Sequence, residues 1–373
     1  MEFTAGFTLV GGGTFVAPLP PPPPSYYLWS WGRNNTGQLG LGNTTYYSSP
    51  KQIGAGITWS SISSIGNFSL AQKTDGTMWA WGSAETGRLG LGNTNNRSSP
   101  VQVGALTTWL KVAAGYYHGI AVKTDGTVWS WGNNNHGQLG LGDSTNRSSP
   151  VQIGALTTWL NVAAGDYHNL ALKTDGTMWS WGRNSYGRLG LGDTTNRSSP
   201  TQVGGLTTWL TISAGDYHSM AVKTDGTLWS WGLGGNGRLG QGATTNVSSP
   251  AQVGALTTWS KIDAASNHSI AVKTDGTLWT WGRNISGELG SNNTTEYSSP
   301  KQVGALTTWL TIAAGYNHSM AVKTDGTLWS WGLGSLGRLG LGDTNNRSSP
   351  VQIGALTTWQ SIAAGRRHSL AIG

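Results

Sequence analysis

The sequence lacks cysteine and has little charge: none of its 373 residues is cysteine, and only 10% are charged. Without cysteine the chain has no disulfide and no thiolate metal site. No stretch approaches the length of a transmembrane helix, so we expect no membrane span. No lysine or arginine precedes Arg33, so the N-terminal region lacks the positive segment that a secretory signal needs.

The charge that is present is mildly basic and spread out. The formal net charge is +7, yet no basic run exceeds Arg366-Arg367. Nucleic-acid binders usually concentrate basic residues in a stripe, so we do not expect nucleic acid as a partner. One repeated lysine position, beside a turn, is expected to form a solvated ring: Lys73, Lys123, Lys173, Lys223, Lys273 and Lys323.

What the sequence has in abundance is tryptophan in a strict repeat. The stretch Trp29-Ser30-Trp31-Gly32 returns with a step of 50 residues, and a third tryptophan follows the same period from Trp59 onward. All 21 tryptophans belong to this pattern. A period near 50 indicates a solenoid or a propeller, because one unit cannot bury its apolar face alone.

The contents of one unit favour the propeller. In the third copy, residues 109–113, 119–123, 128–131 and 151–153 read as short strands, and Thr124-Asp125-Gly126 is a hairpin turn signal. Helical periodicity is absent. Four strands per unit and seven units predict an all-β, seven-bladed β-propeller of four-stranded blades.

The phase of the repeat predicts how the ring closes. Residues 359–372 supply the first two strands of a unit whose third strand, residues 27–31, lies at the other end of the chain. We therefore expect N- and C-terminal strands to pair in one blade, which removes exposed sheet edges. The propeller domain is predicted to span residues 26–373.

Two segments precede the predicted propeller. Residues 18–25 contain Pro18 and the run Pro20–Pro24, which favours a stiff polyproline spacer over a ligand for a proline-recognising domain. Residues 1–17 are interpreted as an apolar anchor, with a disordered tail or an extra strand as the alternatives. The anchor residues would be Phe3, Phe7, Leu9, Val10, Phe15 and Val16.

Several linked motifs in each unit resemble one known family. In the third copy they are Ala113–His118, Ala121–Gly132 and Gly137–Gly142. Together they resemble the regulator of chromosome condensation repeat family over residues 26–373. The resemblance implies a seven-bladed propeller that recognises macromolecules. The founding member, a nucleotide-exchange factor for a small GTPase, binds chromatin through a basic tail that has no counterpart here, so we do not expect its function.

Two other members of the family can be compared with this sequence. The plant ultraviolet-B photoreceptor senses light through tryptophans in a Gly-Trp-Arg-His-Thr motif. The similar stretch here, Gly365-Arg366-Arg367-His368-Ser369, has none, so the tryptophans are interpreted as structural packing. A secreted bacterial inhibitor of β-lactamase is likewise a bare propeller and grips an enzyme with loops on one face, but its secretion signal has no counterpart here.

No catalytic constellation stands out. Six histidines occupy one repeat position, where Phe68 stands in the remaining unit, and His136 stands alone in a variable loop. Equivalent positions lie far apart around a ring and cannot converge on one metal, so we expect each histidine to bond backbone within its blade. The repeated aspartates precede glycine and are predicted to form turns. We expect no enzymatic activity and no cofactor or metal.

Comparing the copies singles out variable loop positions, which we expect to form rings on the propeller. One variable pair precedes each histidine. Its Tyr, Asp, Asn and Arg content suits binding to a protein or glycan surface. The alternative is sequence drift at exposed loops that are under no constraint. A second variable set follows each Trp-x-Trp-Gly strand. The predicted partner-binding residues are Tyr116, Tyr117, Asp166, Tyr167, Asp216, Tyr217, Asn267, Tyr316, Asn317, Arg366 and Arg367.

A partial third ring consists of arginines with glutamine or glutamate at the same position of the other copies. It could hold an anion, but we favour arginines that bond carbonyls of the long loop or lie solvated. The arginines are Arg88, Arg188, Arg238 and Arg338.

These observations predict a non-enzymatic binding or display module. We favour a virion-associated protein of bacteriophage type, used for decoration or host attachment, whose N-terminal segment docks into other virion subunits while the propeller faces outward on the particle. The alternative is a soluble, cytoplasmic regulator or inhibitor that binds one enzyme or GTPase through a propeller face.

Overall fold

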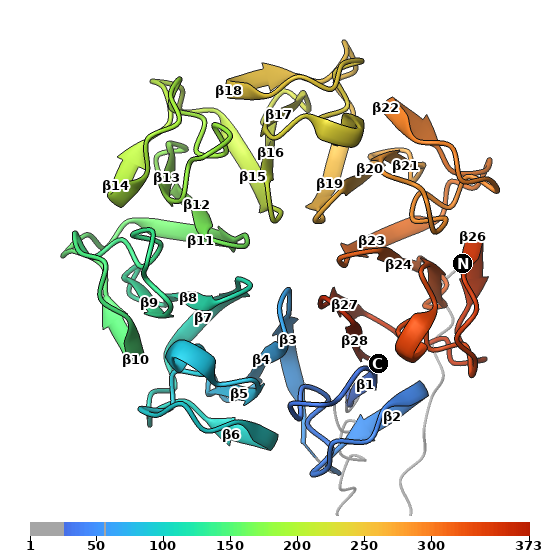
Figure 1. Ribbon diagram of the computed structural model, residues 1–373, viewed down its shortest axis with the longest axis horizontal. Coiled ribbons are helices and arrows are strands. Elements are labelled where there is room, and N and C mark those ends of the chain that lie inside the picture. The colour runs from blue at the N-terminus through green and yellow to red at the C-terminus, as the bar shows by residue number, and fades with distance from the viewer. Residues whose placement is uncertain (1–25, 56) are drawn as a thin grey trace, which may run out of the picture.

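The structure, a computed structural model, describes residues 26–55 and 57–373. Its strands form seven four-stranded antiparallel sheets arranged in a ring, as Figure 1 shows. Residues of all seven sheets line the hollow at the centre of the ring, the central channel. The predicted all-β, seven-bladed propeller is confirmed. The predicted anchor, with Phe3, Phe7, Leu9, Val10, Phe15 and Val16, and the polyproline spacer lie outside the described residues.

Each blade runs from an inner strand at the channel to an outer strand at the rim. The inner strands are β3 (Trp59–Ser63), β7 (Trp109–Ala114), β11 (Trp159–Ala164), β15 (Trp209–Ala214), β19 (Trp259–Ala264), β23 (Trp309–Ala314) and β27 (Ser361–Ala364). The second strands are β4 (Phe68–Lys73), β8 (His118–Lys123), β12 (His168–Lys173), β16 (His218–Lys223), β20 (His268–Lys273), β24 (His318–Lys323) and β28 (His368–Ile372).

The third strands carry the Trp-x-Trp-Gly motif, and the outer strands follow a long loop. The third strands are β5 (Met78–Gly82), β9 (Val128–Gly132), β13 (Met178–Gly182), β17 (Leu228–Gly232), β21 (Leu278–Gly282), β25 (Leu328–Gly332) and β1 (Leu28–Gly32). The outer strands are β6 (Arg97–Gln102), β10 (Arg147–Gln152), β14 (Arg197–Gln202), β18 (Val247–Gln252), β22 (Tyr297–Gln302), β26 (Arg347–Gln352) and β2 (Tyr47–Ile53).

We number the blades 1 to 6 from β3–β6 to β23–β26, and name the seventh the closing blade. In the closing blade β1 pairs with β28, so strands from the two ends of the described chain meet as predicted. Tyr27 and Gly373 exchange two backbone hydrogen bonds, each with an N–O distance of 3.1 Å. The ring is therefore closed by backbone pairing between residues far apart in sequence.

The hydrophobic core lies between the blades. Seven buried clusters are present among the described residues, and each joins two adjacent blades. In the cluster between blades 2 and 3, Ile120 and Val122 of one blade pack with Trp159 and Trp181 of the next. Because no blade buries its apolar face by itself, stability depends on the stacking of neighbours around the ring.

The second tryptophan of each motif ties adjacent blades together. Trp231 in blade 4 is fully buried, and its Nε1 donates to the carbonyl of Arg188 in blade 3 at 2.9 Å. Its ring packs against Gly190, where an added Cβ would come within 2.8 Å of Nε1. The first tryptophan, Trp229, is half-buried and donates to Thr227 of its own blade.

Replacing these two tryptophans gives a matched test of packing between blades. Trp231→Ala should lower the free energy of unfolding by about 3–5 kcal/mol, since it opens a cavity at the blade junction and leaves the Arg188 carbonyl with the Ser219 hydroxyl as its remaining side-chain donor. Trp229→Ala should cost clearly less because its ring is partly exposed. Urea unfolding followed by far-ultraviolet circular dichroism measures both. Equal costs would contradict the assignment of the core to the blade junctions.

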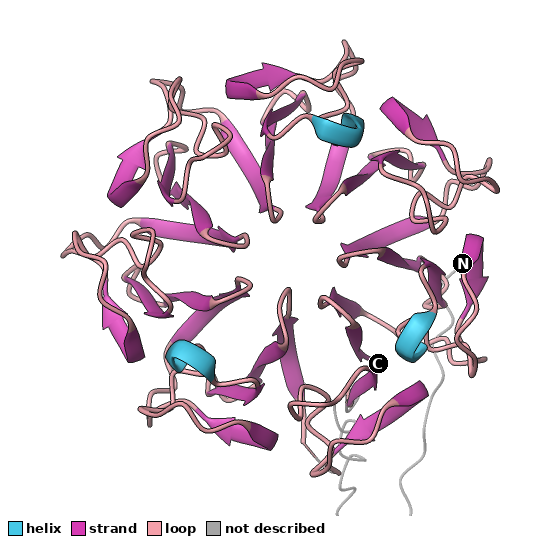
Figure 2. Cartoon of the chain, viewed as in Figure 1, coloured by secondary structure: helices cyan, strands magenta, loops and turns pink. Residues whose placement is uncertain are grey.

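The two faces of the propeller carry different connections. Strands alternate in direction, so the turn between inner and second strands and the loop between third and outer strands emerge on one face, the long-loop face. Three of the long loops contain short 3-10 helices, visible in Figure 2: η1 (Glu85–Gly87), η2 (Gly235–Gly237) and η3 (Ser335–Gly337). The opposite face, the Asp-Gly face, carries the turns between second and third strands.

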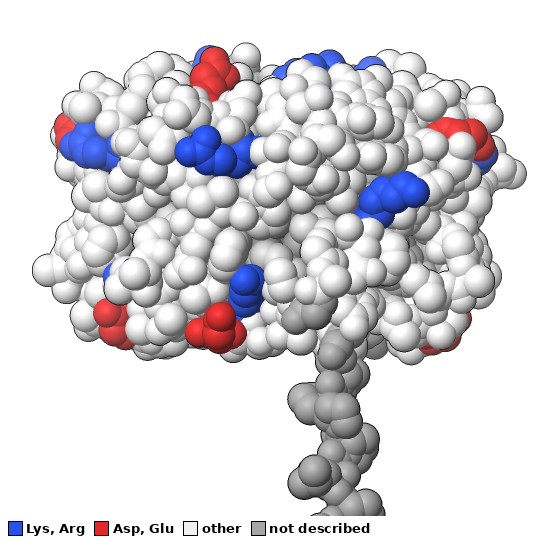
Figure 3. Space-filling view, turned by 90° about the horizontal axis from the view of Figure 1, so that it is seen from below, with Lys and Arg blue, Asp and Glu red and all other residues white. Residues whose placement is uncertain are grey.

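The Asp-Gly turns have the predicted form. Asp125 Oδ1 accepts hydrogen bonds from the backbone N and the hydroxyl of Thr127, and Gly126 has a φ of +76°. The glycine supplies the left-handed conformation, and the aspartate satisfies the following residues. Figure 3 shows that the part of the side wall facing the viewer carries only scattered charged groups.

Candidate protein-binding face

Both variable sets predicted from the sequence lie on the long-loop face and are hydrogen-bonded to each other. The backbone N of Asn133, at the start of one long loop, donates to the carbonyl of Tyr117 at 3.0 Å. The same bond joins Arg183 to Tyr167 at 2.9 Å. The two predicted rings are therefore one continuous surface around the mouth of the channel.

Within each variable pair, the two positions have different environments. The first positions tend to be buried: Tyr116, Asp166 and Asp216 are only 7%, 8% and 5% exposed. The second positions are half-buried and present part of the side chain to solvent: Tyr117, Tyr167, Tyr217, Asn267, Asn317 and Arg367. A partner would therefore touch mainly the second positions, which the first positions support from below.

Three tyrosines form a stack across blades 2 and 3. The ring centroids of Tyr116 and Tyr117 are 4.3 Å apart, and Tyr117 stacks on Tyr167 at 4.7 Å. His136, which the sequence left without a partner, packs edge-on against Tyr167 at 5.0 Å. Rigid aromatic side chains lose little conformational entropy on binding, so this stack is a preorganised contact surface.

Arginine guanidinium groups flank the tyrosines. Arg183 lies 5.5 Å from the ring of Tyr167, and Tyr217 lies between Arg188 at 5.5 Å and Arg238 at 5.6 Å. Across the channel mouth, Arg366 lies 4.9 Å from the rings of both Tyr116 and Tyr316.

Arg366 can reach Tyr116 over blade 1, because the first position of the variable pair there is Gly66. A Cβ at Gly66 would meet the Tyr116 carbonyl at 2.5 Å. Tyrosines and arginines therefore line much of the rim of the mouth, in blades 2 to 4, blade 6 and the closing blade.

The repeated arginines are buried structural groups. Arg188 Nη1 donates to the carbonyl of Asp216 in the next blade at 2.7 Å, and Arg238 Nη1 donates to that of Ser266 at 2.7 Å. Arg238 Nε also donates to Gly235 in its own long loop. The expectation that these arginines bond long-loop carbonyls is confirmed at Arg88, Arg238 and Arg338, and the alternative of solvated side chains is wrong.

Two carboxylates lie side by side in this rim. Burial and the neighbouring Asp216 raise the pKa of Asp166 to about 8, and burial likewise raises the pKa of Asp216. Arg188 acts in the opposite direction on both. The pair is in part protonated at neutral pH, so the two aspartates contribute less negative charge to the face than their number indicates.

The opposite side of the rim is positive. Burial lowers the pKa of Arg338 to about 10, and the nearby charges of Arg367 and Arg33 add to this effect. Arg366 is affected by the same two arginines. No ion pair joins these four arginines to a carboxylate in the described residues. This uncompensated cluster favours a partner that places acidic groups there.

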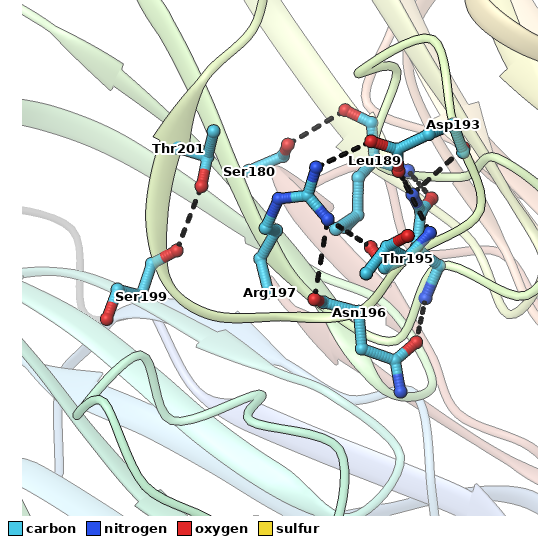
Figure 4. Close-up of polar contacts among 9 residues, drawn as sticks. Ser180, Leu189, Asp193, Thr195, Asn196, Arg197, Ser199 and Thr201 are labelled. Atoms are coloured by element: carbon cyan, nitrogen blue, oxygen red, sulfur yellow. Dashed lines mark hydrogen bonds and ion pairs between the residues drawn. The ribbon is translucent and has the colours of Figure 1, made fainter.

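The long loops are held in place by their own side chains, as Figure 4 shows for blade 3. Arg197 forms an ion pair with Asp193 at 2.6 Å and donates to the carbonyl of Thr195 at 2.8 Å. Asn196 Oδ1 accepts the backbone N of Asn184 at 2.8 Å. These bonds fix the loop before any partner arrives, which lowers the entropy that binding would cost.

The histidines do not bond as predicted. Each of the six repeated histidines is fully buried, and its Nε2 pairs with a side chain of the next blade instead of backbone in its own: His118 with Asn169 at 2.8 Å, and His168 with Ser219 at 2.9 Å. Burial lowers the pKa of His118 to about 4. They are neutral links between blades, and no group of three or more metal-ligating side chains occurs within residues 26–55 and 57–373.

The prediction of a solvated lysine ring is wrong. Lys123 is 7% exposed, and its Nζ lies 3.6 Å from the ring of Trp129 and 5.2 Å from that of Trp109. The lysine stem covers indole surface while the ammonium group lies over the aromatic faces. These lysines therefore stabilise their blades and do not form an electrostatic surface.

Comparison with known proteins shows the family. The profile described as an RCC1-like domain matches residues 26–260, more than half of the chain, and profiles of the regulator of chromosome condensation (RCC1) repeat match residues 275–322 and 325–372. The chain belongs to the RCC1 repeat family. No curated protein sequence matched it.

Solved structures of RCC1-like propellers share the fold. Human WBSCR16 superposes with a TM-score of 0.85 at 22% identity, over 94% of this chain and 99% of its own. Prp20p from Saccharomyces cerevisiae gives a TM-score of 0.85 at 22% identity, over 94% and 91%, and was described with its binding properties to Gsp1p and histones. At this identity the likeness concerns the fold. No helix in the described part of the chain has the length and apolarity to cross a membrane.

Proposed function

We propose that this RCC1 repeat protein is a non-enzymatic protein-binding module that acts on its partner through the long-loop face. The observation that carries the proposal is the preorganised stack of Tyr116, Tyr117 and Tyr167, flanked by His136 and Arg183. Partly exposed tyrosines beside arginine are the side chains that dominate binding energy at protein interfaces. Prp20p, described with binding to Gsp1p and histones, supports a protein partner.

The mode of action that fits best is regulation or inhibition of one partner protein. The rim combines an aromatic side in blades 2 to 4 with a positive side around Arg33, Arg366 and Arg367, so a partner needs apolar and acidic groups placed to match both. Such a two-sided requirement favours one specific protein over a repetitive glycan. Binding of a glycan instead of a protein is one of the outcomes that the test below distinguishes.

The test begins by finding the partner with a photo-crosslinking residue placed at position 117, compared with one at position 206 on the Asp-Gly face. With the partner in hand, Tyr167→Ala should weaken binding by about 2–4 kcal/mol, which is about 30- to 1,000-fold. Leu206→Ala, at an exposed leucine of the other face, should leave affinity unchanged. Loss in the Leu206 variant alone would overturn the choice of face, and capture of a glycan would overturn the partner class.

The virion reading stays a prediction. It depended on residues 1–17, which lie outside the described residues, and the relatives bring no support for a particle. Fractionation of the native source tests it: co-sedimentation of the chain with intact particles would favour display, and a free chain bound to one protein would favour regulation.

A further inference from the structure

Six blades share one arrangement of a lysine over two tryptophans. The lysine Nζ lies 3.5–3.8 Å from the ring centroid of the third-strand tryptophan and 5.0–5.5 Å from that of the inner-strand tryptophan. In blade 6, for example, Lys323 lies over Trp329 at 3.7 Å and near Trp309 at 5.0 Å. The fold therefore builds a cradle for an alkylammonium group six times.

The closing blade has the tryptophans of this cradle without its lysine. Trp29 and Trp359 adopt the same edge-to-face arrangement, with ring centroids 6.0 Å apart and an interplanar angle of 72°. The position that carries lysine elsewhere is Gly373. Trp29 Nε1 has no hydrogen-bond partner in the described residues, because Tyr27 stands where a threonine accepts this donor in the other blades.

A cavity opens onto this tryptophan pair. It lies between blade 6 and the closing blade, has a volume of about 390 Å³, and contains no charged residue in its described lining. Trp29 and Trp359 line it together with Pro50, Leu341, Ile353 and Leu356. The corresponding cavity on the other side of blade 6 is lined by Trp309 and Trp329 and contains Lys323.

We propose that the cavity at Trp29 and Trp359 binds an alkylammonium group, such as the lysine side chain of a partner protein. Aromatic faces attract cations, and the same pair of rings holds a lysine ammonium in each of the other six blades. Residues 1–25 contain no lysine or arginine, so that segment supplies no side-chain cation to the site. The site is separate from the long-loop face.

The test uses the full chain with ¹⁵N-labelled tryptophan and follows the indole N–H signals by NMR. Titration with n-butylammonium should shift the Trp29 and Trp359 signals, whereas the neutral n-butanol should not. Trp29→Leu should weaken the apparent affinity by about tenfold or more, because the ring nearest the cation is lost. A lysine-containing peptide that acts at lower concentration would identify a protein as the source, and equal potency would identify a small alkylammonium compound.

The chain offers a gain-of-site control. Lys323→Gly empties the cradle of blade 6, so butylammonium should then shift the Trp309 and Trp329 signals as well, which raises the number of responding pairs from one to two. Gly373→Lys is a poor control, since a Cβ there would lie 2.6 Å from Trp359 Cε3. Equal shifts with butanol, or no shift at Trp29 in the unsubstituted chain, would overturn the proposal.

Discussion

Lowering the pH from 7 to about 4.5 is expected to unfold the propeller. Six buried histidines have pKa values below the ordinary value of 6.5: burial lowers that of His118 to about 4 and those of His268 and His368 to about 3. Their stabilising contribution is complete above pH 6.5. It is lost as the pH falls toward the pKa values of the folded state, because the histidines of the unfolded chain become protonated while those of the folded chain stay neutral.

The size of the pH effect on the free energy of unfolding follows from the number of protons that the chain takes up on unfolding. Each histidine contributes a slope of about 1.4 kcal/mol per pH unit, so six give about 8 kcal/mol per unit between pH 6.5 and 4. Buried aspartates act in the opposite direction: burial raises the pKa of Asp263 to about 6 and that of Asp166 to about 8, and Asp216 is raised as well. Their stabilisation is greatest at low pH and is lost as the pH rises through those values.

Three aspartates offset about half of the histidine effect, which leaves about 4 kcal/mol per pH unit. Between pH 6.5 and 4.5 the free energy of unfolding therefore falls by about 8 kcal/mol, which exceeds the total for a domain in the lower half of the ordinary range of about 5–15 kcal/mol. Urea unfolding at a series of pH values measures the slope. A chain whose unfolding free energy is the same at pH 7 and pH 5 would contradict the neutral state of the histidines.

The chain contains its own control for this prediction. In blade 1 the histidine position is Phe68, and the position that would pair with it in blade 2 is Gly119, over which the Trp131 ring packs. The double variant His168→Phe/Ser219→Gly copies this natural pair. It should remain folded at pH 7. Because it takes up one proton fewer on unfolding, the slope of unfolding free energy against pH should fall by about 1.4 kcal/mol per pH unit. An unchanged slope would show that His168 takes up its proton while folded.

The same positions explain why the histidine partner was not predicted. Ser219 lies 51 residues after His168, and the repeat is 50 residues long. Ser219 therefore occupies the repeat position directly after that of the histidine, in the next copy. When the copies are nearly identical, a bond within a blade and a bond to the next blade give the same sequence pattern. Only the exception distinguishes them: phenylalanine and glycine occur together in neighbouring blades, at Phe68 and Gly119. Burial of Lys123 was missed for a related reason, since its tryptophan neighbours come from other strands.

Strands and turns were predictable because local signals are sufficient for them. The Asp-Gly turns and the Trp-x-Trp-Gly strands were located within one residue, and β1 begins at Leu28 where residue 27 was expected. The outer strand β10 was expected at Val151 but begins at Arg147. It includes Pro150, which an outer edge strand tolerates, and its register shifts between Arg147 and Val151. The sequence predicted that each variable set forms a ring, but the position of both rings on one face and the burial of Tyr116 next to Tyr117 depend on how the strands pack around the channel.

Removing residues 359–373 should abolish cooperative folding. This deletion takes away β27 and β28, so β1 and β2 lose the strands with which they form the closing blade. It also removes Trp359, Ile362 and Leu370 from the two core clusters beside that blade. Two of seven blade junctions are lost together, and the remaining sheets expose unpaired edges. We expect a broad, non-cooperative urea transition and aggregation in place of a single transition.

A circular permutant separates the loss of closure from simple truncation. Joining Gly373 to Tyr27 through Thr-Asp-Gly, and opening the chain between Ala155 and Leu156, keeps every described strand. The bond from the Gly373 backbone N to the Tyr27 carbonyl matches the bond from the Lys123 N to the Thr127 carbonyl, two residues that the same three-residue turn connects. The permutant should therefore fold and unfold cooperatively. If it fails while the truncated chain succeeds, the ring is held together by blade packing alone and the terminal strand pairing contributes little.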